Sequence, residues 1–119
     1  MAKVTGIGGL FFRATDTKGL SRWYQQHLGI PAPGADVWSQ EAGPTVFAPF
    51  EEKTEYFPAD KRWMLNLRVD DRDAMVAQLR ASGIEVITKP EWDAPYGLFA
   101  RIYDPEGNPI ELWQALDHP

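Results

Sequence analysis

An internal repeat restricts the fold of this chain more than any other feature. Residues 10–16 (LFFRATD) align without a gap with residues 65–71 (LNLRVDD), and leucine, arginine and aspartate recur at matching positions. An apolar stripe at helical spacing follows each copy, and each stripe ends at a glycine, Gly29 or Gly83. A chain of 119 residues that repeats itself after about 54 residues is expected to be one domain built from two similar modules.

Each module is expected to contain one helix near its start. Asp16 and Asp71 suit helix N-caps, because a short carboxylate side chain can accept hydrogen bonds from the free N–H groups of the first turn. The glycines at the other end suit the left-handed position that ends a helix. The sequence therefore predicts helices at residues 17–28 and 72–82.

Strand patterns fill the rest of each module. Short segments rich in β-branched and aromatic residues alternate with turn residues, which is typical of strands. The order in each half is βαβββ, so the sequence predicts an α+β fold in a single domain spanning residues 1–119, with modules at about 5–58 and 63–116. The predicted strands are residues 10–16, 36–40, 44–50 and 54–58 in the first module and residues 65–71, 85–90, 98–104 and 109–115 in the second.

The last two strands are expected to form a hairpin that contains an unusual carboxylate. The stretch Asp104–Asn108 (DPEGN) has turn chemistry, because proline presets φ and Gly107 can adopt a positive φ. Glu111 then lies in the middle of the strand that follows, between Ile110 and Leu112. A charged residue at the centre of an otherwise uncharged strand needs either a partner or a function.

Composition excludes several classes of partner. The net charge of −5 and the pI of about 4.9 argue against nucleic acid, which favours a basic surface. The chain has no cysteine, which excludes disulfides and zinc–thiolate sites within it. The first residues lack the apolar run of a signal peptide, and no stretch approaches the ~20 apolar residues of a membrane span. We therefore expect a cytoplasmic protein without a membrane partner.

Two βαβββ modules with DPEGNPIEL near the end of the second resemble the vicinal oxygen chelate superfamily, which includes glyoxalase I, extradiol dioxygenases and bleomycin-binding proteins. The resemblance covers essentially the whole chain, and the segments FFRATD…WYQQHLGI and RVDDRDAMVAQLRASGIEV carry it in the two modules. It implies that the modules form a cupped, barrel-like sheet. It does not select one activity, because this fold supports lyases, oxygenases, transferases and drug-binding proteins.

In that superfamily, metal ligands point into the cup. The resemblance places the first-strand ligands, usually histidine or glutamine, at Gly9 and Met64, seven residues before Asp16 and Asp71. Glycine offers no donor, and a thioether is too soft for the metals of oxygen-rich sites. The last-strand glutamate of the second module is present as Glu111, and its counterpart in the first module is expected near residues 55–56. We therefore expect no metal and no other cofactor.

Strand alternation predicts which side chains line the cup. Ile110 and Leu112 must share one face with the helices, so Glu111 takes the opposite face, here called the open face. The same alternation in the other strands predicts an open face that is mainly aromatic, with a few polar groups and up to three arginines. Its predicted ligand-binding residues are Phe11, Arg13, Met64, Asn66, Arg68, Phe99, Arg101, Tyr103 and Trp113, with Glu111 as the candidate catalytic residue.

Three functions fit these expectations. The first is a metal-free module that binds or sequesters a small, partly aromatic compound, with an anionic group as one option. The second is a glyoxalase-type lyase or isomerase with Glu111 as general base, and the third is a metal-dependent lyase in which Glu111 is a ligand and Glu55 or a dimer partner completes the site. The structural alternative is that Glu111 pairs with an arginine, with Arg101 on the adjacent strand as first choice. Exposed tryptophans also predict a homodimer.

Overall fold

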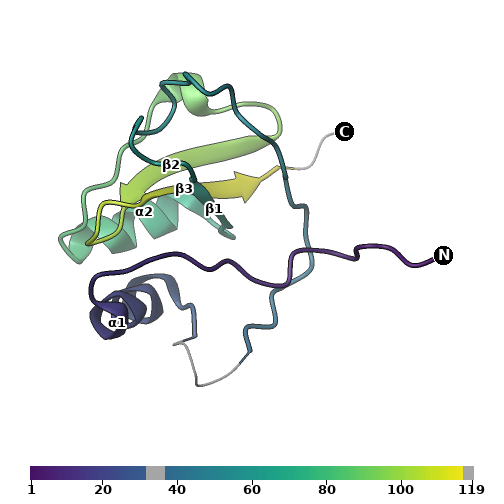
Figure 1. Ribbon diagram of the computed structural model, residues 1–119. Coiled ribbons are helices and arrows are strands. Elements are labelled where there is room, and N and C mark those ends of the chain that lie inside the picture. The colour runs from purple at the N-terminus through teal and green to yellow at the C-terminus, as the bar shows by residue number, and fades with distance from the viewer. Residues whose placement is uncertain (32–36, 117–119) are drawn as a thin grey trace.

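The computed structural model describes residues 1–31 and 37–116, and within them the chain is a small α+β fold (Figure 1). Both predicted helices are present, and the strands belong to the second module. No helix in the described part of the chain is long and apolar enough to cross a membrane. In chain order the elements are α1 (Thr17–Leu28), β1 (Leu65–Arg68), α2 (Arg72–Ala81), the 3₁₀ turn η1 (Pro90–Trp92), β2 (Gly97–Tyr103) and β3 (Pro109–Ala115).

Both helices begin and end as the cap signals predict. The Asp16 carboxylate accepts a hydrogen bond from the Gly19 backbone N–H at 2.9 Å, and the Asp71 carboxylate accepts from that of Ala74 at 3.0 Å. Gly29 and Gly83 have φ values of 71° and 81°, in the left-handed region that favours glycine. The predicted helix bounds are confirmed to within one residue.

The sheet has three strands in the order β1-β3-β2, with β1 parallel and β2 antiparallel to the central β3. The predicted hairpin joins β2 to β3: the Gly107 backbone N–H donates to the Asp104 carbonyl at 2.9 Å, and Gly107 has a φ of 81°. The expected strand at 85–90 reduces to one bridge between Ile87 and Arg101. The second module thus keeps the predicted order of its elements.

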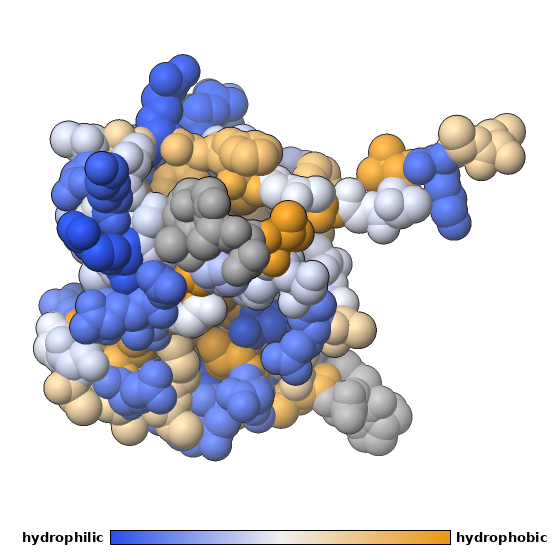
Figure 2. All heavy atoms as spheres, turned by 90° about the horizontal axis from the view of Figure 1, so that it is seen from below, coloured by the Kyte–Doolittle hydropathy of each residue, from blue (hydrophilic) through white to orange (hydrophobic). Residues whose placement is uncertain are grey.

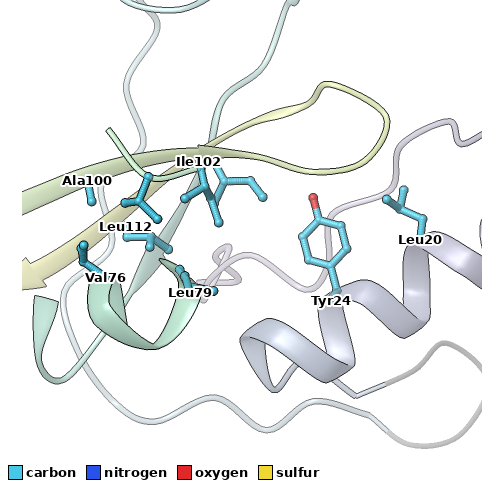
Figure 3. Close-up of a cluster of buried hydrophobic side chains, with 9 residues drawn as sticks. Leu20, Tyr24, Val76, Leu79, Ala100, Ile102 and Leu112 are labelled. Atoms are coloured by element: carbon cyan, nitrogen blue, oxygen red, sulfur yellow. The ribbon is translucent and has the colours of Figure 1, made fainter. Parts of the chain in front are cut away.

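The hydrophobic core lies between the two helices and one face of the sheet (Figure 3). Ile110 and Leu112 of β3 are at most 1% exposed and pack in the same cluster as Val76 and Leu79 of α2. Alternation along the strand then turns Glu111 to the opposite face. The predicted assignment of the two faces of β3 is confirmed, and the core cluster consists of Leu20, Tyr24, Val76, Leu79, Val86, Ala100, Ile102, Ile110 and Leu112.

The expected strands of the first module are not present, so the cupped sheet of two modules is not seen in the described residues. The segments 10–16, 37–40, 44–50 and 54–58 form no strand, while residue 36 lies outside the described residues. Segment 44–50 begins with Pro44 and contains Pro49, and a proline cannot donate to a ladder hydrogen bond. The repeat in sequence is therefore not matched by a repeat in sheet structure.

The N-terminal end consequently projects from the body of the molecule as an arm, and apolar surface is interspersed with charged surface on the face seen in Figure 2. Phe11 is 94% exposed and Phe47 is 85% exposed. Both side chains are therefore largely free of packing against the described residues.

Candidate functional site

Glu111 lies at the centre of the open face, and the register of the sheet places other polar and aromatic residues beside it. Glu111 pairs with Asn66 of β1 on one side and with Arg101 of β2 on the other. Trp113 pairs in the same way with Arg68 and Phe99. β1 and β2 therefore flank the candidate catalytic residue with side chains that the sequence assigned to the open face.

The Glu111 carboxylate is buried and hydrogen-bonded at both oxygens. It is 8% exposed, accepts from the Asn66 side-chain amide at 2.7 Å, and accepts at its other oxygen from the Tyr56 hydroxyl. A buried carboxylate is costly unless such donors satisfy it. Glu111 thus has partners, but they are an amide and a phenol and not a positive charge.

Tyr56 contacts Glu111, although the sequence predicted no binding or catalytic role for it. It comes from residues 51–59, here called the Tyr56 segment, which has no regular secondary structure and lies over the open face, on the side of the sheet away from α2 (Figure 1). The superfamily resemblance placed the first module's counterpart of Glu111 near residues 55–56, and Tyr56 does reach Glu111. It arrives there as a hydrogen-bond donor.

Arg101 is also buried, but the expected ion pair with Glu111 is wrong. Its side chain is 4% exposed, and within the described residues it forms no salt bridge with Glu111. The guanidinium instead donates to the Tyr56 carbonyl at 2.8 Å and lies 4.9 Å from the centre of the Tyr56 ring. Tyr56 separates the two charges by bonding to both, which a strand register cannot reveal.

The environment of Arg101 is aromatic. The guanidinium lies 5.6 Å from the centre of the Trp92 ring, in addition to its contact with Tyr56, and makes a long hydrogen bond of 3.5 Å to the Tyr103 hydroxyl. Its Nε atom is buried and has no hydrogen-bond partner. Cation–π contacts stabilise a guanidinium but do not replace an anion. Arg101 is therefore a buried cation with unused hydrogen-bonding capacity.

A groove of about 840 Å³ runs along Arg101 and is here called the Arg101 groove. Its walls combine the Tyr56 segment with η1 and the outer strand β2. Lys89 adds a second cation, 5.2 Å above the Trp92 ring. Concave sites of this size with aromatic walls and a few charged groups are the usual form of a small-molecule pocket. The lining residues are Glu52 to Ala59, Ile87, Lys89, Trp92, Arg101 and Tyr103.

The remaining predicted residues divide into two sets. Phe99 and Trp113 stack in parallel at 6.3 Å on the open face, and the Trp113 indole N–H donates to the Tyr96 carbonyl at 3.3 Å. Arg68, at the end of β1, donates to the Glu41 carbonyl at 2.9 Å. One face of the sheet or its rim therefore carries six of the predicted residues: Asn66, Arg68, Phe99, Arg101, Tyr103 and Trp113.

The structure does not bring the first-module residues to this face. Phe11 and Arg13 lie in the exposed segment before α1, because that segment forms no strand. Met64 is partly buried and directly precedes β1. The ligand-binding role assigned to these three residues stays a prediction. No strand pairing places Phe11 or Arg13 beside Glu111.

The donor set does not fit the metal that the superfamily resemblance implies. Gly9 has no side chain and Met64 offers a thioether, so of these three positions Glu111 alone offers an oxygen donor. No group of three histidine, cysteine, aspartate or glutamate side chains that could hold a metal lies within residues 1–31 and 37–116. No chemical step is therefore assigned to a metal here.

We predict that the contact between Tyr56 and Glu111 weakens in alkali. Burial and, second, the hydrogen bond to Glu111 raise the pKa of Tyr56 from 10.0 to about 12. Because the folded-state pKa exceeds the unfolded one, this contribution to the free energy of unfolding is complete below pH 10 and is lost as the pH rises through about 12. Urea unfolding at several pH values should show a smaller alkaline loss in Tyr56→Phe than in the wild type.

The exposed Tyr96 provides a matched control, since Tyr96→Phe removes a hydroxyl away from the Arg101 groove. Burial also raises the pKa of Tyr24, so part of the alkaline loss should remain in both variants. The contact would not behave as described if Tyr56→Phe and Tyr96→Phe lost stability identically with pH.

Comparison with known proteins defines the class. The sequence profile of the glyoxalase-like domain matches residues 9–113, so the chain belongs to the glyoxalase-like domain family, within the vicinal oxygen chelate superfamily. The match includes the first module, where the structure has no strands. The membership confirms the predicted superfamily, and no curated protein sequence matches the chain.

Two solved structures from Streptomyces sp. CB03234 are similar to this chain. TnmS3, an antibiotic binding protein, is 23% identical, with a TM-score of 0.63 over 97% of this chain and 99% of its own. A glyoxalase/bleomycin resistance protein is 44% identical, with a TM-score of 0.37. That match covers 42% of this chain and 42% of the other protein's length. The likeness to TnmS3 shows the fold.

Proposed function

We propose that this protein is a metal-free binding module that holds a small, partly aromatic, anionic compound in the Arg101 groove. The observation that supports it is the state of Arg101, a guanidinium that is 4% exposed, contacts two aromatic rings, forms no salt bridge within the described residues, and keeps its Nε unpartnered. Buried charges are normally paired. An anionic ligand would provide the missing partner.

Two further features support an aromatic ligand. The Trp92 ring lines the groove and offers flat apolar surface next to the Arg101 charge. The likeness in fold to an antibiotic binding protein is consistent with sequestration of a drug-like molecule. In this proposal the protein binds its ligand without chemically changing it. The two-module cup expected from the superfamily stays a prediction.

The proposal predicts that aromatic anions bind and that Arg101 is required. Naphthoate should quench tryptophan fluorescence to saturation, and Arg101→Gln should weaken its binding about tenfold or more, since a hydrogen bond to a charged group contributes about 1.5–3 kcal/mol. Arg22→Gln is the matched control, because Arg22 is exposed on α1 and does not line this groove. Equal affinity in the wild type and Arg101→Gln would contradict the proposal.

The alternative is a glyoxalase-type lyase or isomerase with Glu111 as general base. The feature in its favour is a carboxylate that is 8% exposed among aromatic residues. Against it, Glu111 does not line the Arg101 groove and the Tyr56 hydroxyl donates to its carboxylate, so a substrate in the groove could reach Glu111 only if Tyr56 moved away. Deuterium uptake from heavy water into a bound carbonyl compound, lost in Glu111→Gln, would favour the enzyme.

The absence of a metal is also part of the proposal and is open to direct measurement. Elemental analysis of protein purified without chelator should find zinc, nickel, manganese and iron well below one equivalent per chain, because the first-strand positions offer no suitable donor. Glu111→Gln should leave that content unchanged. A stoichiometric metal that disappears in Glu111→Gln would instead support the metal-dependent lyase.

The expected homodimer and cytoplasmic location stay predictions. Trp38 and Trp63 are 44% and 72% exposed and would suit an interface, in which tryptophan is enriched. Analytical ultracentrifugation distinguishes a species of 13.5 kDa from one of twice that mass.

A further inference from the structure

Tyr56 makes the contacts that a ligand in this site would make. Its hydroxyl donates to the Glu111 carboxylate, its ring lies 4.9 Å from the Arg101 guanidinium, and its carbonyl accepts from Arg101 at 2.8 Å. One residue thus donates to the buried carboxylate and accepts from the buried guanidinium, while the Arg101 Nε stays without a partner.

The segment that carries Tyr56 is hydrogen-bonded to the described β-strands through this residue. Its other hydrogen bonds are local, from the Thr54 N–H to the Glu51 carbonyl at 3.0 Å, from the Tyr56 N–H to the Thr54 hydroxyl at 3.2 Å and from the Lys61 N–H to the Pro58 carbonyl at 3.0 Å. Within the described residues, both of its hydrogen bonds to β-strands come from Tyr56. Glu51, Glu52 and Lys53 are exposed. Apart from the contacts of Tyr56 itself, no hydrogen bond from the segment to a described β-strand would be lost if it moved, and segments with few such bonds open readily.

Removal of Tyr56 would leave specific vacancies at the two buried charges. One oxygen of Glu111 would lack its donor, and Arg101 would lack an acceptor in addition to the one its Nε already lacks. Unsatisfied buried charges are strongly unfavourable, so a molecule that replaces Tyr56 must provide a donor and an acceptor. Its body must be flat to take the place of the Tyr56 ring, which lies 4.9 Å from the guanidinium and 6.0 Å from the Trp92 ring.

We propose that Tyr56 occupies the binding site of the free protein as a built-in substitute for the ligand, and that the ligand is a hydroxyaryl compound with a carbonyl or carboxylate acceptor. The ligand hydroxyl takes the place of the Tyr56 hydroxyl at Glu111, and its acceptor takes the place of the Tyr56 carbonyl at Arg101. This inference rests on the proposed function and narrows its ligand class. Because Tyr56 is tethered, it competes at a high effective concentration and weakens binding in the wild type.

The test compares para-hydroxyphenylacetate with phenylacetate in the wild type and in Tyr56→Ala by isothermal titration calorimetry. In Tyr56→Ala, para-hydroxyphenylacetate should bind about tenfold or more tightly than phenylacetate, because only the former donates to Glu111. It should also bind about tenfold or more tightly to Tyr56→Ala than to the wild type, because the competitor has been removed. Tyr96→Ala, an exposed tyrosine outside the groove, should bind like the wild type.

A second variant and a separate readout keep the outcomes distinct. Tyr56→Phe retains the ring and carbonyl but not the donor, so its affinity for para-hydroxyphenylacetate should lie between those of the wild type and Tyr56→Ala. Equal affinities for the two probes in Tyr56→Ala, or no gain over the wild type, would overturn the inference. If naphthoate still bound in an Arg101-dependent way, the proposed function would stand without it, whereas loss of that dependence would remove both.

Discussion

Replacing Asp104 with alanine is expected to lower the free energy of unfolding by about 3 kcal/mol. The Asp104 carboxylate is 4% exposed and accepts from the Tyr24 hydroxyl at 2.6 Å, from the Asn108 side-chain amide at 2.8 Å, and from the backbone N–H groups of Glu106 and Asn108 at 2.8 and 3.0 Å. It therefore shapes the hairpin turn and joins that turn to α1. Alanine would leave the buried Tyr24 hydroxyl without an acceptor.

Urea denaturation of four proteins would measure this contribution. The wild type, Asp104→Ala, Tyr24→Phe and the variant that carries both changes form a double-mutant cycle. Its coupling energy should exceed about 0.5 kcal/mol. Asp70→Ala is the matched control, because Asp70 is an exposed carboxylate near the start of α2 and its removal should change stability by less than about 0.5 kcal/mol. If Asp104→Ala behaved like Asp70→Ala, the Asp104 carboxylate would not be what joins the turn to α1.

Leu79→Ala should have a similar or larger effect, a loss of about 2–5 kcal/mol in the free energy of unfolding. Leu79 is 1% exposed and packs from α2 onto the sheet face that carries Ile110 and Leu112. Alanine favours the helix itself, so the loss comes from apolar contacts and from the cavity that remains. In a three-stranded sheet covered on this face by helices, few other residues can compensate.

Gln78→Ala gives the control for helix propensity, because Gln78 is the exposed neighbour of Leu79 on α2. Its stability should remain within about 0.5 kcal/mol of the wild type, and thermal unfolding of both variants would show the difference. A loss below about 1 kcal/mol in Leu79→Ala would mean that the core can close around the smaller side chain.

The structure also limits what Glu111 can do in the free protein. Two neutral donors hold its carboxylate, and Tyr56 separates it from Arg101. The two charges are therefore bridged by one residue, whose hydroxyl contacts Glu111 and whose carbonyl contacts Arg101. This arrangement satisfies the two charges in part without a ligand, whereas an enzyme would need Tyr56 to withdraw before Glu111 could act.

The sequence alone was sufficient for the elements whose signals are local. The caps at Asp16 and Asp71, the glycines that end the helices and the turn at Asp104–Asn108 all depend on residues within a few positions of one another. Strand alternation likewise determined that Ile110 and Leu112 are buried and that Glu111 faces away from the helices, because the side-chain period of a strand is two. The resemblance to the superfamily, carried by the same local motifs, is confirmed by the family match over residues 9–113.

Tertiary structure alone decided the partners of Glu111 and Arg101 and the state of the first module. Tyr56 is 55 residues from Glu111 and 45 from Arg101 along the chain, and it reaches them from a segment without periodicity, so no local pattern identifies it. In the first module the repeated sequence predicts strands, but a strand exists only when a neighbour accepts and donates its backbone hydrogen bonds. Residues 10–16 and 44–50 have strand-like composition and no such neighbour here, because pairing between distant segments is decided by the packing of the whole chain.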